Sequence, residues 1–358
     1  MTTWRHRVHC PAMVLTLSKT ADEEKRQPCL FGPLSTVHGV VTAAGGPKQA
    51  VDAAHIATLS PSPGSLPRAL SGRNGRLIAD TAAAALIRDV EGGTYRGYSY
   101  SAWCLAGLPH REHPKDQNWL IETDFARLLV RPGIRLRDDN SEEHIGVPHG
   151  SFARLLLVDL QSEALEKGSR DISLGRSASA LVARLQVARG GPTNAKVADQ
   201  LERLATCSID FAFGSDKKGV IVNERLVDKF EYASEPDPRS RKSMRVIQRV
   251  LLSSAFFDEL RRHPVLVDRA ALRDLATSPL AIDVYLWLAY RLHALQSETP
   301  VGWDRLWRQF GTRVGKLKNF KSQLEAPLHL ALSAYTSARV NITDRGLLLQ
   351  PSPPPVNH

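Results

Sequence analysis

Residues 278–295 constrain the fold more than any other stretch, because they read SPLAIDVYLWLAYRLHAL and are apolar on nearly every side of a helix. A helix without a polar face is buried inside a protein rather than laid on its surface. Pro279 suits the first turn of this helix, where a missing backbone N–H removes no hydrogen bond. We therefore expect a buried helix here, with other elements packed around it.

The residues that follow predict three further elements in a fixed order. Residues 303–310 form a short helical pattern, and residues 315–335 carry apolar side chains at three- and four-residue steps. Residues 338–350 contain two short strand patterns around a turn at Asp344, Arg345 and Gly346. Helix, short helix, amphipathic helix and hairpin is the order of a winged-helix domain. In such a domain the third helix enters the DNA major groove and the hairpin touches the backbone.

The polar face of this third helix has the residue types that read DNA. Lys reaches phosphates and guanine edges, and Asn or Gln pairs with adenine through two hydrogen bonds. The alternative is a solvated basic face on an ordinary helix, and Pro327 is expected to kink or end the helix near Ala326. The residues predicted to contact DNA here are Arg313, Lys316, Lys318, Asn319, Lys321, Ser322, Gln323 and, on the hairpin, Arg345.

A second copy of this order is predicted between residues 150 and 252. It has an apolar helix, a helix capped by Ser177, a third helix over 193–206, later strand patterns and a basic loop over 237–242. The third helix is the weaker candidate for the groove, because it also contains Asp199 and Glu202. The residues predicted to contact DNA in this copy are Arg176, Arg189, Lys196, Gln200, Arg203, Arg239, Arg241 and Lys242, with Gln200 and Arg203 expected on the exposed face.

The rest of the chain completes an α+β prediction with two tandem winged-helix domains. Residues 1–76 lack a sustained period and have the composition of a disordered extension. Residues 77–90 are read as a helix, and 94–108 and 118–130 as one strand each. The predicted division is a disordered extension (1–76), a first winged-helix domain with N-terminal strands (77–254), a second winged-helix domain (255–350) and a Pro-rich tail (351–358).

Net charge and apolar content limit the function classes. The chain has 358 residues and a net charge of +10, which favours a polyanionic partner, most simply nucleic acid. The plainer alternative is a soluble protein that happens to be basic. No apolar run reaches the roughly 18–20 residues that span a bilayer. We therefore expect a cytoplasmic protein without membrane contact.

Motifs for catalysis and for a metal are missing from the sequence. There is no GxxxxGK[ST] phosphate loop and no HExxH pair. Cys104, His110 and His113 are close in sequence, but the tight CxxC-type pair of a structural zinc site is absent, so a polar loop is the preferred interpretation. We expect a protein that is not an enzyme and that binds no cofactor and no metal. RNA binding is disfavoured, since no GXXG loop or RNP-like strand occurs.

Several separated runs resemble the plasmid-encoded RepA replication-protein family. They are GVPHGSFARLLLVDLQSEA (146–164), GSRDISLGRS (168–177), SPLAIDVYLWLAYRLHAL (278–295) and VGWDRLWRQFG (301–311), with LPHR (108–111) before them. The resemblance implies a plasmid replication initiator that binds double-stranded DNA at origin repeats. It also implies repression of its own promoter as a homodimer, and host helicase-loading or initiator proteins as partners. The alternative is a winged-helix transcriptional regulator without a replication role.

Overall fold

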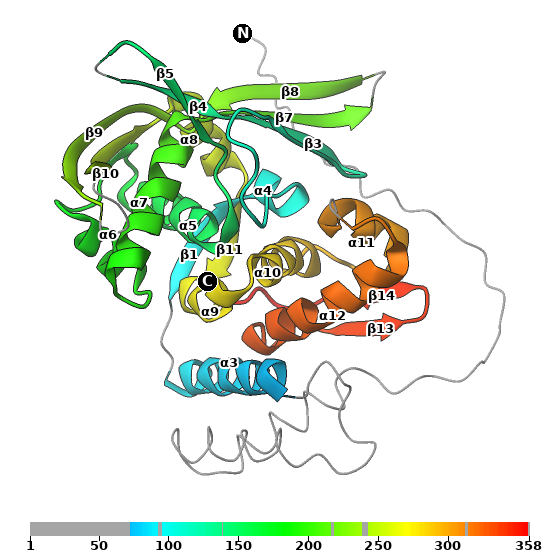
Figure 1. Ribbon diagram of the computed structural model, residues 1–358. Coiled ribbons are helices and arrows are strands. Elements are labelled where there is room, and N and C mark those ends of the chain that lie inside the picture. The colour runs from blue at the N-terminus through cyan, green and yellow to red at the C-terminus, as the bar shows by residue number, and fades with distance from the viewer. Residues whose placement is uncertain are drawn as a thin grey trace, which may run out of the picture.

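The computed structural model describes residues 72–91, 95–137, 139–215, 218–237, 243–311 and 314–356 (Figure 1). This part of the chain mixes helices with small antiparallel sheets, so the predicted α+β class is confirmed. The predicted disordered extension lies outside the described residues up to position 71. Its last residues belong to helix α3 (Gly72–Glu91), so the predicted boundary at position 76 is wrong.

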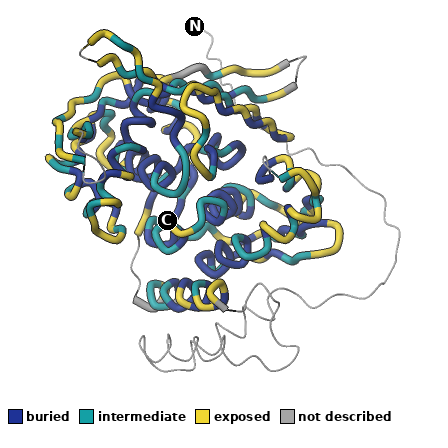
Figure 2. The backbone as a smooth tube through the Cα atoms, viewed as in Figure 1, coloured by how far each residue is buried: buried dark blue, intermediate teal, exposed yellow. Residues whose placement is uncertain are grey.

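Helix α10 (Pro279–Leu292) lies at the centre of the core and is buried on nearly every side, as its apolar sequence predicts. Ser278 caps it, because its side chain accepts a hydrogen bond from the N–H of Ala281 at 3.2 Å. Tyr285 and Trp287 are among the largest fully buried side chains. One continuous core joins α10 to the elements on both sides of it, seen as dark blue tube in Figure 2.

The first unit, residues 150–252, has the order helix, strand, helix, helix and hairpin. Its first strand pairs with the second strand of the hairpin, where Ile172 lies opposite Val250. The resulting antiparallel sheet has the order β6-β10-β9. The elements are α5 (Gly150–Lys167), β6 (Asp171–Ser173), α6 (Ala178–Leu185), α7 (Gly191–Thr206), β9 (Val227–Pro236) and β10 (Ser243–Leu252).

The second unit, residues 279–349, repeats this order, and its sheet has the corresponding strand order β12-β14-β13. The first strand, β12, was not predicted, since it falls in a polar stretch and is too short to show an alternating pattern. The elements after α10 are β12 (Thr299–Gly302), α11 (Trp303–Phe310), α12 (Leu317–Ala334), β13 (Val340–Thr343) and β14 (Gly346–Leu349). The described residues therefore contain the same arrangement twice.

The first unit carries additions that the second unit lacks in the described residues. A hairpin between α7 and β9 completes a four-stranded sheet of order β2-β3-β7-β8, and another hairpin precedes α5. The strands are β2 (Trp119–Glu122), β3 (Ala126–Arg131), β7 (Ser208–Ser215), β8 (Lys218–Arg225), and the earlier hairpin β4 (Gly133–Leu136) with β5 (Glu142–Gly146).

Short elements tie the N-terminal part of the chain to the segment between the units. β1 (Arg96–Tyr100) pairs with β11 (Pro264–Asp268), and α3 lies against α12, where Thr336 Oγ1 donates to Asp89 at 2.9 Å. Segments assigned by sequence to the first domain therefore contact the second unit. The remaining linking elements are α4 (Ser101–Leu105), α8 (Ser254–Arg262), α9 (Arg269–Asp274) and the 3-10 turn η2 (Leu275–Thr277).

Three sequence expectations about these elements are wrong. The strand expected over 94–108 ends at Tyr100, and the helix α4 follows with four consecutive buried residues instead of an alternating pattern. The strand expected over 118–130 is a hairpin, since Thr123 Oγ1 accepts hydrogen bonds from the N–H groups of Phe125 and Ala126 and turns the chain. Pro327 does not end α12, because burial of Leu324 and Leu328 on either side of it holds the helix in the core.

A buried ion pair joins the first helices of the two units. Arg154 of α5 donates from Nε and Nη2 to the two carboxylate oxygens of Asp283 on α10, both at 2.6 Å. His110 lies 2.8 Å from the same carboxylate. Burial alone would raise the pKa of Asp283, but Arg154 and His110 together hold it below its ordinary value. The pair therefore fixes α5 against α10 as charged partners.

In the described part of the chain, every helix is too short or too polar to span a bilayer.

Candidate nucleic-acid interface

The first turns of α12, up to Lys321, present a basic face, and the acid Glu325 follows one turn later on the same side. Phe320 and Leu324 are 1% exposed and anchor the helix in the core. Their helical spacing forces the residues between them outward, which is the face that the sequence predicts. The exposed residues on this face are Lys316, Lys318, Asn319, Ser322 and Gln323.

Lys321 lies at the edge of this face and is half-buried. Its Nζ is 5.1 Å from the centre of the Trp303 ring, a cation–π distance. Trp303 Nε1 in turn donates to the carbonyl oxygens of Thr343 at 3.2 Å and Asp344 at 2.9 Å. One tryptophan at the start of α11 therefore links the basic helix to the turn of the β13–β14 hairpin.

The hairpin turn holds Arg345 in an exposed position beside α11. The carbonyl of Arg345 accepts a hydrogen bond from the backbone N–H of Trp303 at 3.1 Å. Gly346 follows with φ +152°, and a Cβ there would lie 2.0 Å from the carbonyl oxygen of Val301. Only glycine fits this close approach of β14 to β12, so the turn cannot move away from α11 without breaking the sheet.

The arginines of α11 are already paired. Arg305 Nε lies 3.1 Å from one oxygen of Asp124 and Arg308 Nε lies 2.7 Å from the other. Asp124 belongs to the β2–β3 turn of the first unit's additional sheet. Arg308 also lies 3.3 Å from Asp304, so acids engage both arginines. The exposed cations of the second unit without an ion pair in the described residues are Lys316, Lys318, Arg339 and Arg345.

The third helix of the first unit is different, and the prediction that it exposes Gln200 and Arg203 is wrong. These side chains are only 5% and 4% exposed. Gln200 Oε1 accepts from the N–H of His149 at 2.7 Å, and Arg203 donates to Asp199 at 2.9 Å and to the carbonyl of Val147 at 3.3 Å. The segment just before α5 therefore covers the middle of α7.

The β4–β5 hairpin covers the same helix from another side. Arg135 donates two hydrogen bonds to Glu202, one of them from Nε at 3.0 Å. Burial alone would lower the pKa of Arg135, but the hydrogen bond and charge of Glu202 raise it above its ordinary value. Arg245 Nη1 of β10 lies 3.6 Å from Glu202 Oε1, the oxygen that accepts from Arg135 Nε. The polar residues of α7 are thus used inside the protein.

Other predicted contacts of the first unit stay exposed around the start of α7. Asn194 Nδ2 donates to Ser179 Oγ at 2.8 Å, which ties the first turn of α7 to α6. The exposed cations are Arg176, Arg189 and Lys196. The predicted residues Arg239, Arg241, Lys242 and Arg313 lie outside the described residues.

Two pairings of arginine with tyrosine were missed from the sequence. Arg245 lies 4.7 Å above the ring of Tyr232, beside the loop that joins β9 to β10. Arg273 lies 5.5 Å from the ring of Tyr95. The partners belong to different segments, and β9 was not predicted as a strand, so no local pattern indicates either pairing.

The residues considered for zinc are engaged elsewhere. Cys104 is buried in the core, and burial raises the pKa of its thiol far above the ordinary value. His110 is bound to Asp283, and His113 Nε2 lies 3.0 Å from the carbonyl oxygen of Asn118. These positions do not converge on a common point for a metal.

Comparison with known protein families finds a match in the middle of the chain. Residues 147–305 match the family model described as plasmid encoded RepA protein, which confirms the resemblance seen in the sequence. The match begins just before α5 and ends within α11, so α12 and its hairpin lie beyond it.

Two crystal structures of another protein match the chain at low similarity. The crystal structure of selenomethionine derivatives of domain 2 and domain 3 of RctB matches with 13% identity and a TM-score of 0.47, over 70% of this chain and 95% of that one. A crystal structure of RctB domains 2–3 matches with 12% identity and a TM-score of 0.41, over the same shares of each chain. None of the curated protein sequences compared with the chain matches it.

Proposed function

We propose that the chain is a plasmid replication initiator that binds specific double-stranded DNA through two winged-helix units. The observation that carries the proposal is the basic face at the start of α12, where Lys316, Lys318 and Lys321 precede the acid Glu325, on a helix whose other face is buried. The repeated order of elements and the matching strand orders support the winged-helix assignment. The family of residues 147–305 supports the replication role.

In this proposal α12 reads base edges in the major groove. Asn319 and Gln323 are one helical turn apart on the exposed face, and each amide can form two hydrogen bonds with an adenine. Lys316 and Lys318 contact phosphates or guanine edges, and Arg345 contacts the backbone from the hairpin turn. Lys321, held over Trp303, would couple the position of the helix to that of the hairpin.

The first unit contributes mainly contacts to phosphates. Arg176, Arg189 and Lys196 are exposed near the start of α7, whereas Gln200 and Arg203 are buried and are not part of the proposed interface. Phosphate contacts position a protein on the duplex without reading its sequence. The second unit would therefore supply most of the specificity.

The proposal includes no chemical step by this chain. As the family resemblance implies, the bound protein would recruit host helicase-loading or initiator proteins, and a homodimer would repress the promoter of its own gene. Its place of action would be the cytoplasm, where the plasmid lies.

The test is a gel-shift titration of the full chain on DNA that flanks its own gene, with excess nonspecific competitor and at two salt concentrations. We expect a ladder of discrete shifted bands that survives the competitor, because origin repeats offer several adjacent sites. A single band over one inverted repeat at a promoter would favour a transcriptional regulator instead. Binding that disappears with competitor or with modest salt would reduce the interaction to phosphate attraction and overturn the proposal.

A further inference from the structure

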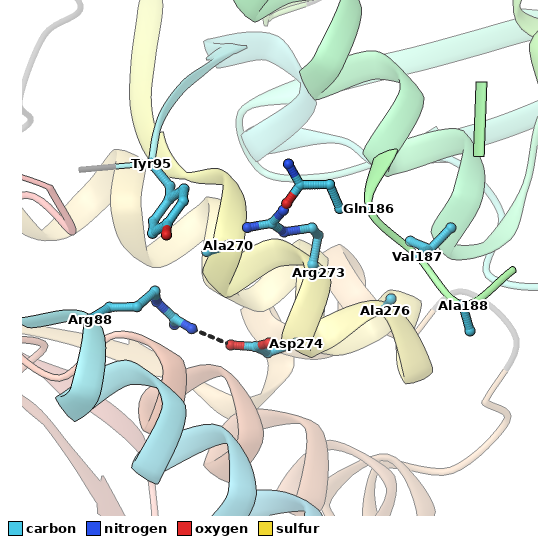
Figure 3. Close-up of a pocket in the computed structure, with 9 residues that line it drawn as sticks. All are labelled: Arg88, Tyr95, Gln186, Val187, Ala188, Ala270, Arg273, Asp274 and Ala276. Atoms are coloured by element: carbon cyan, nitrogen blue, oxygen red, sulfur yellow. Dashed lines mark hydrogen bonds and ion pairs between the residues drawn. The ribbon is translucent and has the colours of Figure 1, made fainter. Parts of the chain in front are cut away.

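An open groove lies where the turn between α6 and α7 faces α9 and the end of α3 (Figure 3). Its volume is about 520 Å³, and it continues into a neighbouring groove of about 330 Å³ that shares Tyr95, Gln186 and Arg273 with it. Figure 3 shows Arg273 between Tyr95 and Gln186, with Arg88 and Asp274 paired on the α3 side. No residue of this groove belongs to the predicted interface.

Among the described residues that line the larger groove, Arg273 is the charged side chain without an ion pair, and the exposed acid Glu166 lines the neighbouring groove. Arg88 pairs with Asp274 at 2.6 Å and with Asp268 at 3.4 Å. In the neighbouring groove, Arg184 and Arg269 share the carboxylate of Asp159. Within the described residues, Arg273 has no acidic group within 4.0 Å, and its guanidinium lies 5.5 Å from the ring of Tyr95 instead.

An unmatched guanidinium in this position needs acceptors from outside the protein. Arg273 is half-buried, and burial lowers its pKa from the ordinary value although Asp274 and Asp268 act in the opposite direction. A guanidinium has five N–H donors and no acceptor, and its planar fork matches the oxygens of a phosphate. Two arginines, Arg88 and Arg273, and one acid, Asp274, line this groove, so its lining carries one positive charge in excess for an incoming oxyanion. Asp268, which also pairs with Arg88, is not part of the lining.

The position of the groove indicates which oxyanion is near. Val187 and Ala188 form one wall, and the exposed Arg189 follows them directly in the turn before α7. In a helix-turn-helix module the end of the third helix that follows this turn approaches the DNA. The groove thus opens beside the part of the first unit whose cations, Arg189 and Lys196, remain exposed.

We propose that this groove is a binding site for a backbone phosphate of DNA, with Arg273 donating to the phosphate oxygens and Tyr95 orienting its guanidinium. The inference rests on the proposed DNA-binding function and adds to it a contact beside the first unit that α12 cannot make. Since Arg273 belongs to α9, between the units, the contact also fixes the path of the duplex between the two third helices.

The experiment measures binding of the full chain to its origin DNA over a series of salt concentrations, comparing wild type with Arg273→Gln. We expect a loss of roughly threefold to tenfold in affinity for specific and nonspecific DNA alike, and a salt dependence that is lower by about one phosphate contact. Arg273→Lys keeps the charge and should keep most of the salt dependence. The melting temperature of Arg273→Gln should not fall, because no ion pair is lost.

The matched control is Arg262→Gln, which removes one charge from an exposed arginine of α8 that pairs with Glu259 at 2.6 Å. It should change affinity by less than about twofold. An unchanged salt dependence in Arg273→Gln would overturn the site, as would a lower melting temperature that accounts for the weaker binding. If Asn319→Ala weakens specific binding while Arg273→Gln does not, only this inference fails. If wild type binds no specific DNA, the proposed function itself fails.

Discussion

The third helices of the two units occupy equivalent places in the same order of elements, yet they use their polar residues in opposite ways. On α7, Gln200 and Arg203 point into the protein and bind its own backbone and carboxylates. On α12, Lys318, Asn319 and Gln323 are exposed, and the acid on this side of the helix, Glu325, comes after them. The residue types on a helix do not by themselves create a DNA-binding face. Whether the polar side chains are exposed depends on which other segments of the protein pack over the helix.

The cause of the difference lies in the additions to the first unit. The β4–β5 hairpin and the residues just before α5 lie over α7, and Gly146 approaches Arg203 so closely that a Cβ would be 2.4 Å from its Nη1. Helix α3 lies against α12, but it leaves Lys318, Asn319, Ser322 and Gln323 exposed. One third helix therefore contributes to stability and the other remains available for a partner.

The variant for which we expect the largest effect tests whether the buried ion pair between α5 and α10 holds the two units together. Asp283→Leu should lower the free energy of unfolding by about 3–5 kcal/mol, because Arg154 would be left buried without its partner. Urea unfolding followed by tryptophan fluorescence measures this loss. The double variant Arg154→Met with Asp283→Leu should recover much of it. A single variant as stable as wild type would show that the pair does not hold α5 to α10.

A second variant tests the internal role assigned to α7. Arg203→Met should lower the free energy of unfolding by about 2 kcal/mol, since it removes hydrogen bonds to a carboxylate and to a buried carbonyl. Thermal and urea unfolding measure the effect. Specific DNA affinity at a temperature where the variant is folded should match that of wild type. A stable variant with weakened specific binding would place Arg203 at the DNA instead.

A pH series separates the buried half of α12 from its exposed half. Burial lowers the pKa of His329 to about 4, below the ordinary value of 6.5. The unfolded chain therefore takes up a proton before the folded protein does, so this contribution to stability is complete above pH 6.5 and is lost as the pH falls toward 4. Between pH 7.5 and 5 the loss should be about 2 kcal/mol. His329→Leu should remove that part of the pH dependence, and an identical acid limb in both proteins would contradict the burial.

The smallest expected effect concerns the exposed start of α7. Lys196→Ala removes one phosphate contact, so affinity should fall by about threefold for specific and nonspecific DNA equally, and the salt dependence should drop by about one contact. Salt titrations of both DNA types measure this. A loss confined to specific DNA would mean that α7 reads bases after all, and the contrast between the third helices would disappear.

The sequence predicted what depends on local spacing. The apolar pattern of α10 and the single exposed face of α12 follow from residues within a few turns, and the structure confirms both. Asp283 inside an apolar helix signals a buried partner, but that partner, Arg154, lies 129 residues earlier. Arg203 likewise reaches Glu112, 91 residues away. When a segment distant in the sequence packs over a helix, the spacing of apolar residues in that helix does not change. Such burial therefore cannot be predicted from the helix sequence.

Pro327 shows the reverse limit of local reasoning. Proline removes one backbone hydrogen bond from a helix and usually ends or kinks it. In α12 the residues after Pro327, including Leu328 and Leu330, are buried against the core and keep the helix continuous to Ala334. Tertiary packing therefore overrides the tendency of proline to end or kink a helix. The residues near Pro327 do not indicate this outcome in the sequence.

The specificity ratio, affinity for origin DNA divided by affinity for scrambled DNA of equal length, shows whether α12 reads the base sequence. It should be measured at one salt concentration for wild type, for Lys318→Ala with Asn319→Ala, and for Lys196→Ala. We expect a fall of more than about tenfold in the ratio for the α12 variant, with an unchanged melting temperature, and no change for Lys196→Ala. An unchanged ratio for the α12 variant would mean that α12 is not the helix that reads the bases.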